Sequence, residues 1–176
     1  MGVNIFVVVT RRQVAEFPGE AAAAGIKKFP AFVEARKKNW AYLRKALNKF
    51  SGKLVLPEPT PKSDPSWFGF LVTVKDNAGF TRDQLVAHLE ANKIQTRMLF
   101  AGNLIKHPCF DEMRKTGKGF RVVSGESSNL PVLQSSLPVT DRILNNTFWI
   151  GVYPGMTPAM LKYIAGVFTY FFARPA

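Results

Sequence analysis

The stretch that decides the fold is Thr147-Phe148-Trp149-Ile150-Gly151-Val152-Tyr153-Pro154-Gly155-Met156-Thr157-Pro158. Its first half alternates apolar residues with Trp149, Gly151 and Tyr153, and this period of two predicts a β-strand. The Pro-Gly pair favours a turn, and Thr157 followed by proline is typical of a helix start with Thr157 as the N-cap. The helix that follows has a broad apolar arc, made of Met160, Leu161, Ile164, Val167, Phe168, Phe171 and Phe172.

Three further elements are predicted upstream of this stretch. The segment Ser66–Val74 has Phe68, Phe70, Val72 and Val74 at alternate positions, which predicts a strand with one buried face. Thr81 and Gln84 form a capping box, so a helix should run through to Glu90 with Leu85, Val86 and Leu89 facing inward. Residues Gln95–Phe100 indicate another strand, and a short helix is expected near Val139–Asn145.

A long basic helix is predicted between Phe29 and Phe50. Its apolar residues recur every three or four positions and are Phe29, Val33, Trp40, Leu43, Leu47 and Phe50. Only Arg36 interrupts this stripe. Pro30 fits the first turn, Gly52 is a plausible stop, and the prolines from Pro57 to Pro65 should keep the following connector extended.

These elements together predict an α+β fold. We expect a small, mainly antiparallel sheet of three to four strands with helices packed on one face, plus the long N-terminal amphipathic helix. Residues 1–26, with a strand-like Asn4–Thr10, form an atypical N-terminal segment, and residues 27–176 form one small domain. The serine- and glycine-rich residues 115–136 are expected to be a surface loop.

Composition narrows the functional classes. The chain has 176 residues, of which 47% are hydrophobic, so it can bury a core. A net charge of +12 indicates either a solvated basic face or a module that binds nucleic acid or an acidic membrane surface. The single cysteine excludes an internal disulfide framework. The apolar run Ile5–Val9 is too short to span a bilayer and its basic residues follow it, so we expect no transmembrane segment and a cytoplasmic location.

Three phrases in the chain carry a resemblance to a known family. They are Ser66–Val74, Ile94–Leu104 and Leu137–Thr157. Together they resemble the C-terminal domain of the DegT/StrS sugar aminotransferase family. The closest branch is that of the pyridoxamine-phosphate-dependent CDP-4-keto-6-deoxyglucose 3-dehydratases of lipopolysaccharide biosynthesis.

The resemblance implies an incomplete enzyme. In that family the large domain holds pyridoxal or pyridoxamine phosphate (PLP or PMP), and no cofactor motif of that domain can be matched in this chain. We therefore expect a truncated or split small domain without the N-terminal catalytic half. It would have no catalytic or cofactor-binding residue of its own. PLP or PMP would bind only when a large domain is present, and a second chain could supply that domain. An apolar stripe that lacks its natural cover would also favour self-association into a non-catalytic dimerising fragment.

The same resemblance places the segment from Arg97 to Phe110 at the nucleotide-sugar substrate. Arg97 can bind a phosphate bidentately, and Asn103 can bond a sugar hydroxyl or keto oxygen, with His107 as a third candidate and Lys106 beside it. The alternatives stay open. Arg97 can simply point outward from a strand, Asn103 can cap the turn after its preceding glycine, and His107 can be structural.

Other chemistry-bearing residues have simpler interpretations. A metal site or a nucleophilic pair at His107 and Cys109 is disfavoured, because too few ligands are present and no third orienting group is evident. Cys109 is expected to be a packed apolar residue. Asp141-Arg142 is explained by a local ion pair or a helix-start charge. Trp67, Trp149 and Tyr153 are expected to belong to the core.

Overall fold

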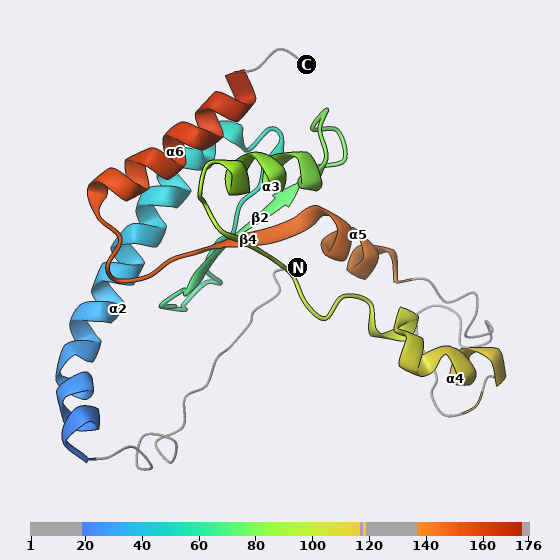
Figure 1. Cartoon of the computed structure of the whole chain (residues 1–176), viewed down its shortest axis with the longest axis horizontal. Helices are drawn as coiled ribbons and strands as arrows, with labels where there is room; N and C mark the ends of the chain where they lie inside the picture. Colours follow the sequence, from blue (N-terminus) through green and yellow to red (C-terminus); the bar gives the residue numbers. More distant parts are fainter. Residues whose placement is uncertain (1–18, 117, 119–136, 174–176) are drawn as a thin grey trace.

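An antiparallel sheet lies at the centre of the described part of the chain (Figure 1). The computed structural model describes residues 19–116, 118 and 137–173, with side chains from residue 25 onward. The sheet has the strand order β1 (Leu54–Val55), β2 (Gly69–Val74), β4 (Thr147–Gly151), β3 (Thr96–Met98), and all neighbours are antiparallel. This confirms the predicted sheet, although β3 is shorter than expected and β1 was not predicted.

One face of the sheet is buried. Phe70 of β2 pairs with Ile150 of β4, and Val72 pairs with Phe148. All four residues are at most 1% exposed. The alternation in both strands therefore predicted the core face. Phe68 is the exception, because it precedes β2 and is 46% exposed.

Helices α2 (Gly19–Leu47), α3 (Arg82–Ala91) and α6 (Pro158–Ala173) contribute to the same hydrophobic core as that face, which confirms the α+β class (Figure 1). The predicted capping box begins α3: the Gln84 amide donates to Thr81 Oγ1 at 3.2 Å, and the Thr81 amide donates to Gln84 Oε1 at 2.8 Å. At the start of α6, the Met160 amide donates to Thr157 Oγ1 at 3.3 Å. Both helix starts were thus predictable from local residues.

The long helix α2 begins earlier than predicted. It starts at Gly19, so Pro30 lies inside the helix rather than in its first turn, and residue 26 is not an element boundary. Alanine has the highest helix propensity of all residue types. The run of alanines upstream of Phe29 therefore explains why the helix begins earlier than predicted. The proposed domain division at residues 26 and 27 stays a prediction.

The apolar stripe of α2 is buried only in its second half. Leu43 and Leu47 are fully buried, whereas Phe29 is 63% exposed. The stripe continues through the 3₁₀ turn Asn48–Phe50, where Phe50 stacks on Phe172 of α6 with ring centroids 4.1 Å apart. Figure 1 shows the N-terminal half of α2 extending away from the sheet and the other helices.

The proline-rich connector neutralises part of the basic face of α2. Lys37 Nζ donates to Asp64 Oδ2 at 2.6 Å, and this bond raises the pKa of Lys37. Arg44 Nη2 donates to Glu58 Oε1 at 2.6 Å. These cations have partners within the chain, although the interpretation as a nucleic-acid or membrane module is not tested by this and stays a prediction.

Two shorter helices lie on the other side of the molecule in Figure 1: α4 (Asp111–Thr116), which was not predicted, and α5 (Pro138–Asn146), which was. Helix α4 includes the first two residues of the predicted loop 115–136. The rest of that loop, apart from residue 118, lies outside the described residues, and so does the strand-like Asn4–Thr10. Across the described ranges, no helix has the length and apolarity needed to cross a membrane.

Candidate functional site

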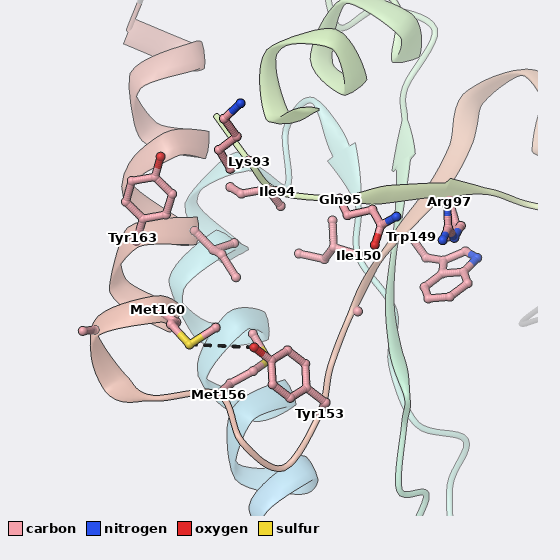
Figure 2. Close-up of a pocket in the computed structure, with 13 residues that line it drawn as sticks. Lys93, Ile94, Gln95, Arg97, Trp149, Ile150, Tyr153, Met156, Met160 and Tyr163 are labelled. Carbon is pink, nitrogen blue, oxygen red and sulfur yellow. Dashed lines mark hydrogen bonds between the residues drawn. The ribbon is translucent and has the colours of Figure 1, made fainter. Parts of the chain in front are cut away.

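A pocket of about 640 Å³ opens between β3, the end of β4 and the first turns of α6 (Figure 2). The side chains on the β3 side come from the turn after α3 and from β3 itself, and those on the other side come from the Pro-Gly turn and α6. The residues that line it are Lys93, Ile94, Gln95, Arg97, Trp149, Ile150, Gly151, Tyr153, Met156, Ala159, Met160, Tyr163 and Ile164. No carboxylate is found among these described lining residues.

Arg97 lies on β3 directly opposite Trp149 of β4, so the two side chains share one face of the sheet. Figure 2 shows the guanidinium beside the indole. The preceding residue anchors the strand, because Glu90 Oε1 accepts from the Thr96 amide at 2.6 Å and from Thr96 Oγ1 at 2.7 Å. These hydrogen bonds lower the pKa of Glu90, and the nearby positive charge of Arg97 adds to the effect. Arg97 is itself exposed.

The indole of Trp149 has a defined position at the surface. A Cβ atom on Gly69 would lie 2.8 Å from Trp149 Cε3, so the ring covers this glycine closely. Phe68 packs against the indole edge-on, with ring centroids 5.2 Å apart and planes at 81°. Trp149 is half-buried and Tyr153 is 46% exposed, so the prediction that they belong to the core was wrong. Strand alternation contains the missed signal, because Trp149 has the opposite parity to the buried Phe148 and Ile150.

Asn103 lies in a separate corner, between the 3₁₀ turn Leu104–Lys106 and α5. It is 2% exposed and its Nδ2 donates to Asp141 Oδ1 at 2.9 Å, while Lys106 Nζ donates to Asp141 Oδ2 at 2.7 Å. The bonds from Lys106 and then Asn103 lower the pKa of Asp141. Asn103 makes no side-chain cap to the turn, and its Oδ1 is buried without a hydrogen-bond partner among the described residues.

His107 follows in the same corner. Its Nε2 lies 2.6 Å from the carbonyl oxygen of Ala101, and because a carbonyl can only accept, Nε2 carries the hydrogen and a neutral ring keeps Nδ1 as an acceptor. Arg114 holds the backbone here by donating to the carbonyl of His107 at 3.0 Å. The structure therefore brings Asn103 and His107 together in one turn, whereas Arg97 lines the pocket. That these three residues bind substrate stays a prediction.

Two simpler interpretations need correction. Of the two interpretations of Asp141-Arg142, the local ion pair is wrong, because Asp141 bonds Lys106 and Arg142 Nε lies 3.3 Å from Asp76 Oδ2. Successive residues on a helix point in different directions, so adjacent charges rarely meet. The helix-start charge is confirmed, because Asp141 lies in the first turn of α5. Cys109 is exposed rather than packed.

The described residues do not fit the B6 cofactor that the resemblance implies. A lysine that forms a Schiff base needs burial or a neighbouring cation to lose its proton, yet every described lysine is exposed or half-buried. Lys37 has a raised pKa, which is the opposite of what this chemistry requires. None of the described carboxylates is buried where it could pair with a pyridine nitrogen. No reaction step can be assigned to the cofactor from these residues.

Comparison with known sequences gives the family. Residues 20–169 match the family model described as the DegT/DnrJ/EryC1/StrS aminotransferase family. The chain is 43% identical over 160 residues to the lipopolysaccharide biosynthesis protein RfbH of Salmonella typhimurium, covering 91% of this chain and 33% of that protein. It is also 43% identical over 153 residues to dTDP-4-dehydro-2,6-dideoxy-D-glucose 3-dehydratase of Saccharopolyspora spinosa, covering 87% of this chain and 29% of that one. The chain thus spans about a third of the length of these relatives.

Solved structures agree on the fold. GDP-4-keto-6-deoxy-D-mannose-3-dehydratase of E. coli, with bound hydrated PLP, superposes with a TM-score of 0.63 at 24% identity, covering 83% of this chain and 33% of that one. A DegT DnrJ EryC1 StrS aminotransferase from Brucella abortus superposes with a TM-score of 0.66 at 19% identity, and the match covers 88% of this chain and 35% of that one. Because the family model matches most of the sequence, the chain belongs to the DegT/DnrJ/EryC1/StrS aminotransferase family.

Proposed function

We propose that this chain is the small domain of a PLP- or PMP-dependent nucleotide-sugar 3-dehydratase or aminotransferase of deoxysugar biosynthesis. The observation that carries the proposal is the 43% identity to two relatives, one named for lipopolysaccharide biosynthesis and the other a sugar 3-dehydratase. The chain would act together with the family's large domain, on the same polypeptide or on a second one. The poor fit of the described lysines and carboxylates to the cofactor supports this division of labour.

In this proposal the small domain binds and orients the nucleotide sugar. Arg97 offers an exposed guanidinium to a phosphate. In the corner near α5, His107 Nδ1 is the acceptor that a sugar hydroxyl would need. Asn103 Nδ2 already donates to Asp141 and its Oδ1 is buried, so Asn103 would bond the substrate only if this corner opens on binding. The ion pair of Lys106 with Asp141 would position this corner. The bound cofactor would supply the electron sink for the reaction.

A reconstitution experiment tests the proposal. The chain is mixed with PMP and a CDP-4-keto-6-deoxyhexose, with and without a separately produced large domain from a family member, and cofactor absorbance and substrate loss are followed. Turnover should need both parts. His107→Gln should raise KM more than it lowers kcat, because it removes a binding contact. Lys45→Gln, on the exposed side of α2, is the matched control and should leave both constants unchanged.

Two results contradict the proposal. If the chain and the large domain never bind the cofactor together, the chain is not a functional small domain. If the chain alone forms a borohydride-reducible adduct between PLP and one of its own lysines, the cofactor site does not need a large domain.

A non-catalytic dimerising role is a second candidate, and a specific observation favours it. Ile26, Phe29 and Phe32 on the N-terminal half of α2 are 57%, 63% and 45% exposed. Apolar side chains concentrated on one helix segment tend to drive association. Self-association through this segment would leave the pocket and the Asn103 corner free. The cytoplasmic location stays a prediction.

A further inference from the structure

We infer that Glu90 is a positioning residue: its carboxylate holds the first residue of β3 and thereby fixes the place and direction in which Arg97 leaves the sheet. The importance of Arg97 for binding rests on the proposed function, whereas its positioning by Glu90 can be measured on the isolated chain. Three features support the inference: the shortness of an edge strand, the two hydrogen bonds of the carboxylate, and the shared face of Gln95 and Arg97.

Strand β3 needs support from outside its own ladder. It is three residues long, which is the short end of the usual range, and it lies at the edge of the sheet with only β4 beside it. An edge strand is held by a ladder of backbone hydrogen bonds on one side only. A slip by one residue would turn Arg97 from the open face of the sheet to the buried face. The position of Arg97 therefore depends on an anchor that fixes the register.

Glu90 provides this anchor from the end of α3. The Thr96 amide donates to Glu90 Oε1 at 2.6 Å, and Thr96 Oγ1 donates to the same oxygen at 2.7 Å. One carboxylate oxygen thus holds both the backbone and the side chain of the first residue of β3. Because these bonds come from a helix and not from the sheet, they fix Thr96 independently of its pairing with Ile150 in β4.

The helix itself does not account for a carboxylate at this point. Glu90 lies in the last turn of α3, where the negative end of the helix dipole disfavours a negative charge. The hydroxyl and the amide of Thr96 nevertheless lower the pKa of Glu90, and the positive charge of Arg97 contributes to this effect. The carboxylate therefore stays ionised at neutral pH and is stabilised by β3 rather than by its own helix.

Gln95 and Arg97 flank Thr96 and share the face opposite to it, because successive side chains along a strand alternate. Thr96 is 6% exposed, whereas both neighbours are exposed. When the amide oxygen of Gln95 faces the guanidinium, it accepts from Arg97 Nη2 at 3.0 Å, and Figure 2 shows the two side chains next to each other. Fixing Thr96 therefore fixes both the base of Arg97 and the neighbour that orients its guanidinium.

Nuclear magnetic resonance of the isolated, nitrogen-labelled chain tests the positioning. The heteronuclear NOE of the Arg97 Nε–H group reports how ordered this side chain is. In Glu90→Ala this NOE should fall, and the Thr96 amide hydrogen should exchange at least about ten-fold faster, because its acceptor is gone. Glu90→Gln keeps an acceptor oxygen without the charge, so its values should lie between those of Glu90→Ala and the unmodified chain. Asp83→Asn removes an exposed charge from the first turn of the same helix and should change neither signal.

A double-mutant cycle in the reconstituted enzyme tests whether Glu90 acts through Arg97. Glu90→Ala should raise KM about two- to ten-fold with little change in kcat, because a misplaced guanidinium weakens binding. In an Arg97→Gln background the same change should have no further effect on KM, since no guanidinium is left to position. Asp83→Asn is again the control and should leave KM unchanged. A purely structural role of Glu90 would raise KM equally in both backgrounds.

The inference is overturned if the Arg97 NOE is the same in Glu90→Ala and Asp83→Asn, or if the two KM effects are additive. Circular dichroism shows whether Glu90→Ala is folded; if it is not, Glu90→Gln takes its place in both experiments, with a smaller effect in the same direction. If the NOE falls but the reconstituted enzyme shows no turnover, the proposed function is contradicted and the positioning of Arg97 by Glu90 stands.

Discussion

Replacing Leu47 with alanine should destabilise the domain far more than replacing Phe29 with alanine, although both residues belong to the same apolar stripe of α2. Leu47 is fully buried in the core, whereas Phe29 is 63% exposed. A buried leucine that becomes alanine loses its transfer free energy and leaves a cavity. An exposed phenylalanine loses little, because the surrounding water already contacts most of its ring.

The expected magnitudes differ several-fold. Leu47→Ala should lower the free energy of unfolding by about 2–5 kcal/mol. This is a large part of the roughly 5–15 kcal/mol that small domains have. Phe29→Ala should change it by no more than about 0.5 kcal/mol. The helix itself is not weakened by either change, since alanine has the highest helix propensity.

Urea unfolding followed by circular dichroism measures both values. The midpoint for Leu47→Ala should fall by roughly 1–2 M with the slope unchanged, and that for Phe29→Ala should stay where it is. Sedimentation should show weaker self-association for Phe29→Ala if the exposed segment of α2 mediates it. The reasoning is refuted if Phe29→Ala destabilises the monomeric chain as much as Leu47→Ala does. That result would mean that the whole stripe packs against the domain.

Two further predictions concern the open face of the sheet and the corner at α5. Gly69→Ala should cost about 1–3 kcal/mol and alter the tryptophan fluorescence, because its Cβ would lie 2.8 Å from the indole of Trp149. Its cross-strand partner is the control: Gly151→Ala has no atom within 4 Å of the new Cβ and should be tolerated better, which thermal unfolding would check. For Asp141, hydrogen bonds hold the folded-state pKa below the ordinary value of 3.8, so its stabilising effect is complete above about pH 4 and is lost as the pH falls through the folded-state pKa. Asp141→Asn should therefore melt at a lower temperature than the unmodified chain near neutral pH, and the difference should vanish in acid; a constant difference at all pH values would count against the bonds from Lys106.

The elements that could be predicted share one property, which is that their signals lie within a few residues. The capping box at Thr81 and Gln84 and the N-cap at Thr157 formed as expected, because side chain and backbone partners are three residues apart. The alternation in Ser66–Val74 predicted the buried face of β2 for the same reason. Arg97 was placed correctly on a strand, since its neighbours have strand propensity.

The site depended on longer distances in the sequence. Asn103 was predicted either to bind substrate or to cap its own turn, yet its side-chain partner is Asp141, which is 38 residues away. No local pattern specifies such a contact. Trp149 was expected in the core because large aromatic residues usually lie there, but Gly69 on the neighbouring strand provides the space for its ring on the open face. This pairing depends on the register of β2 and β4.

The sequence by itself determined the family, the α+β class, the starts of α3 and α6, and the apolar faces of β2 and β4. The tertiary structure alone decided which half of the α2 stripe is covered and which aromatic rings border a pocket. The physical reason is that hydrogen bonding at a cap and alternation along a strand are local, whereas burial depends on what a distant segment places nearby. Phe29 and Leu47 look alike in the sequence, and only Leu47 lies where the core of the domain covers it.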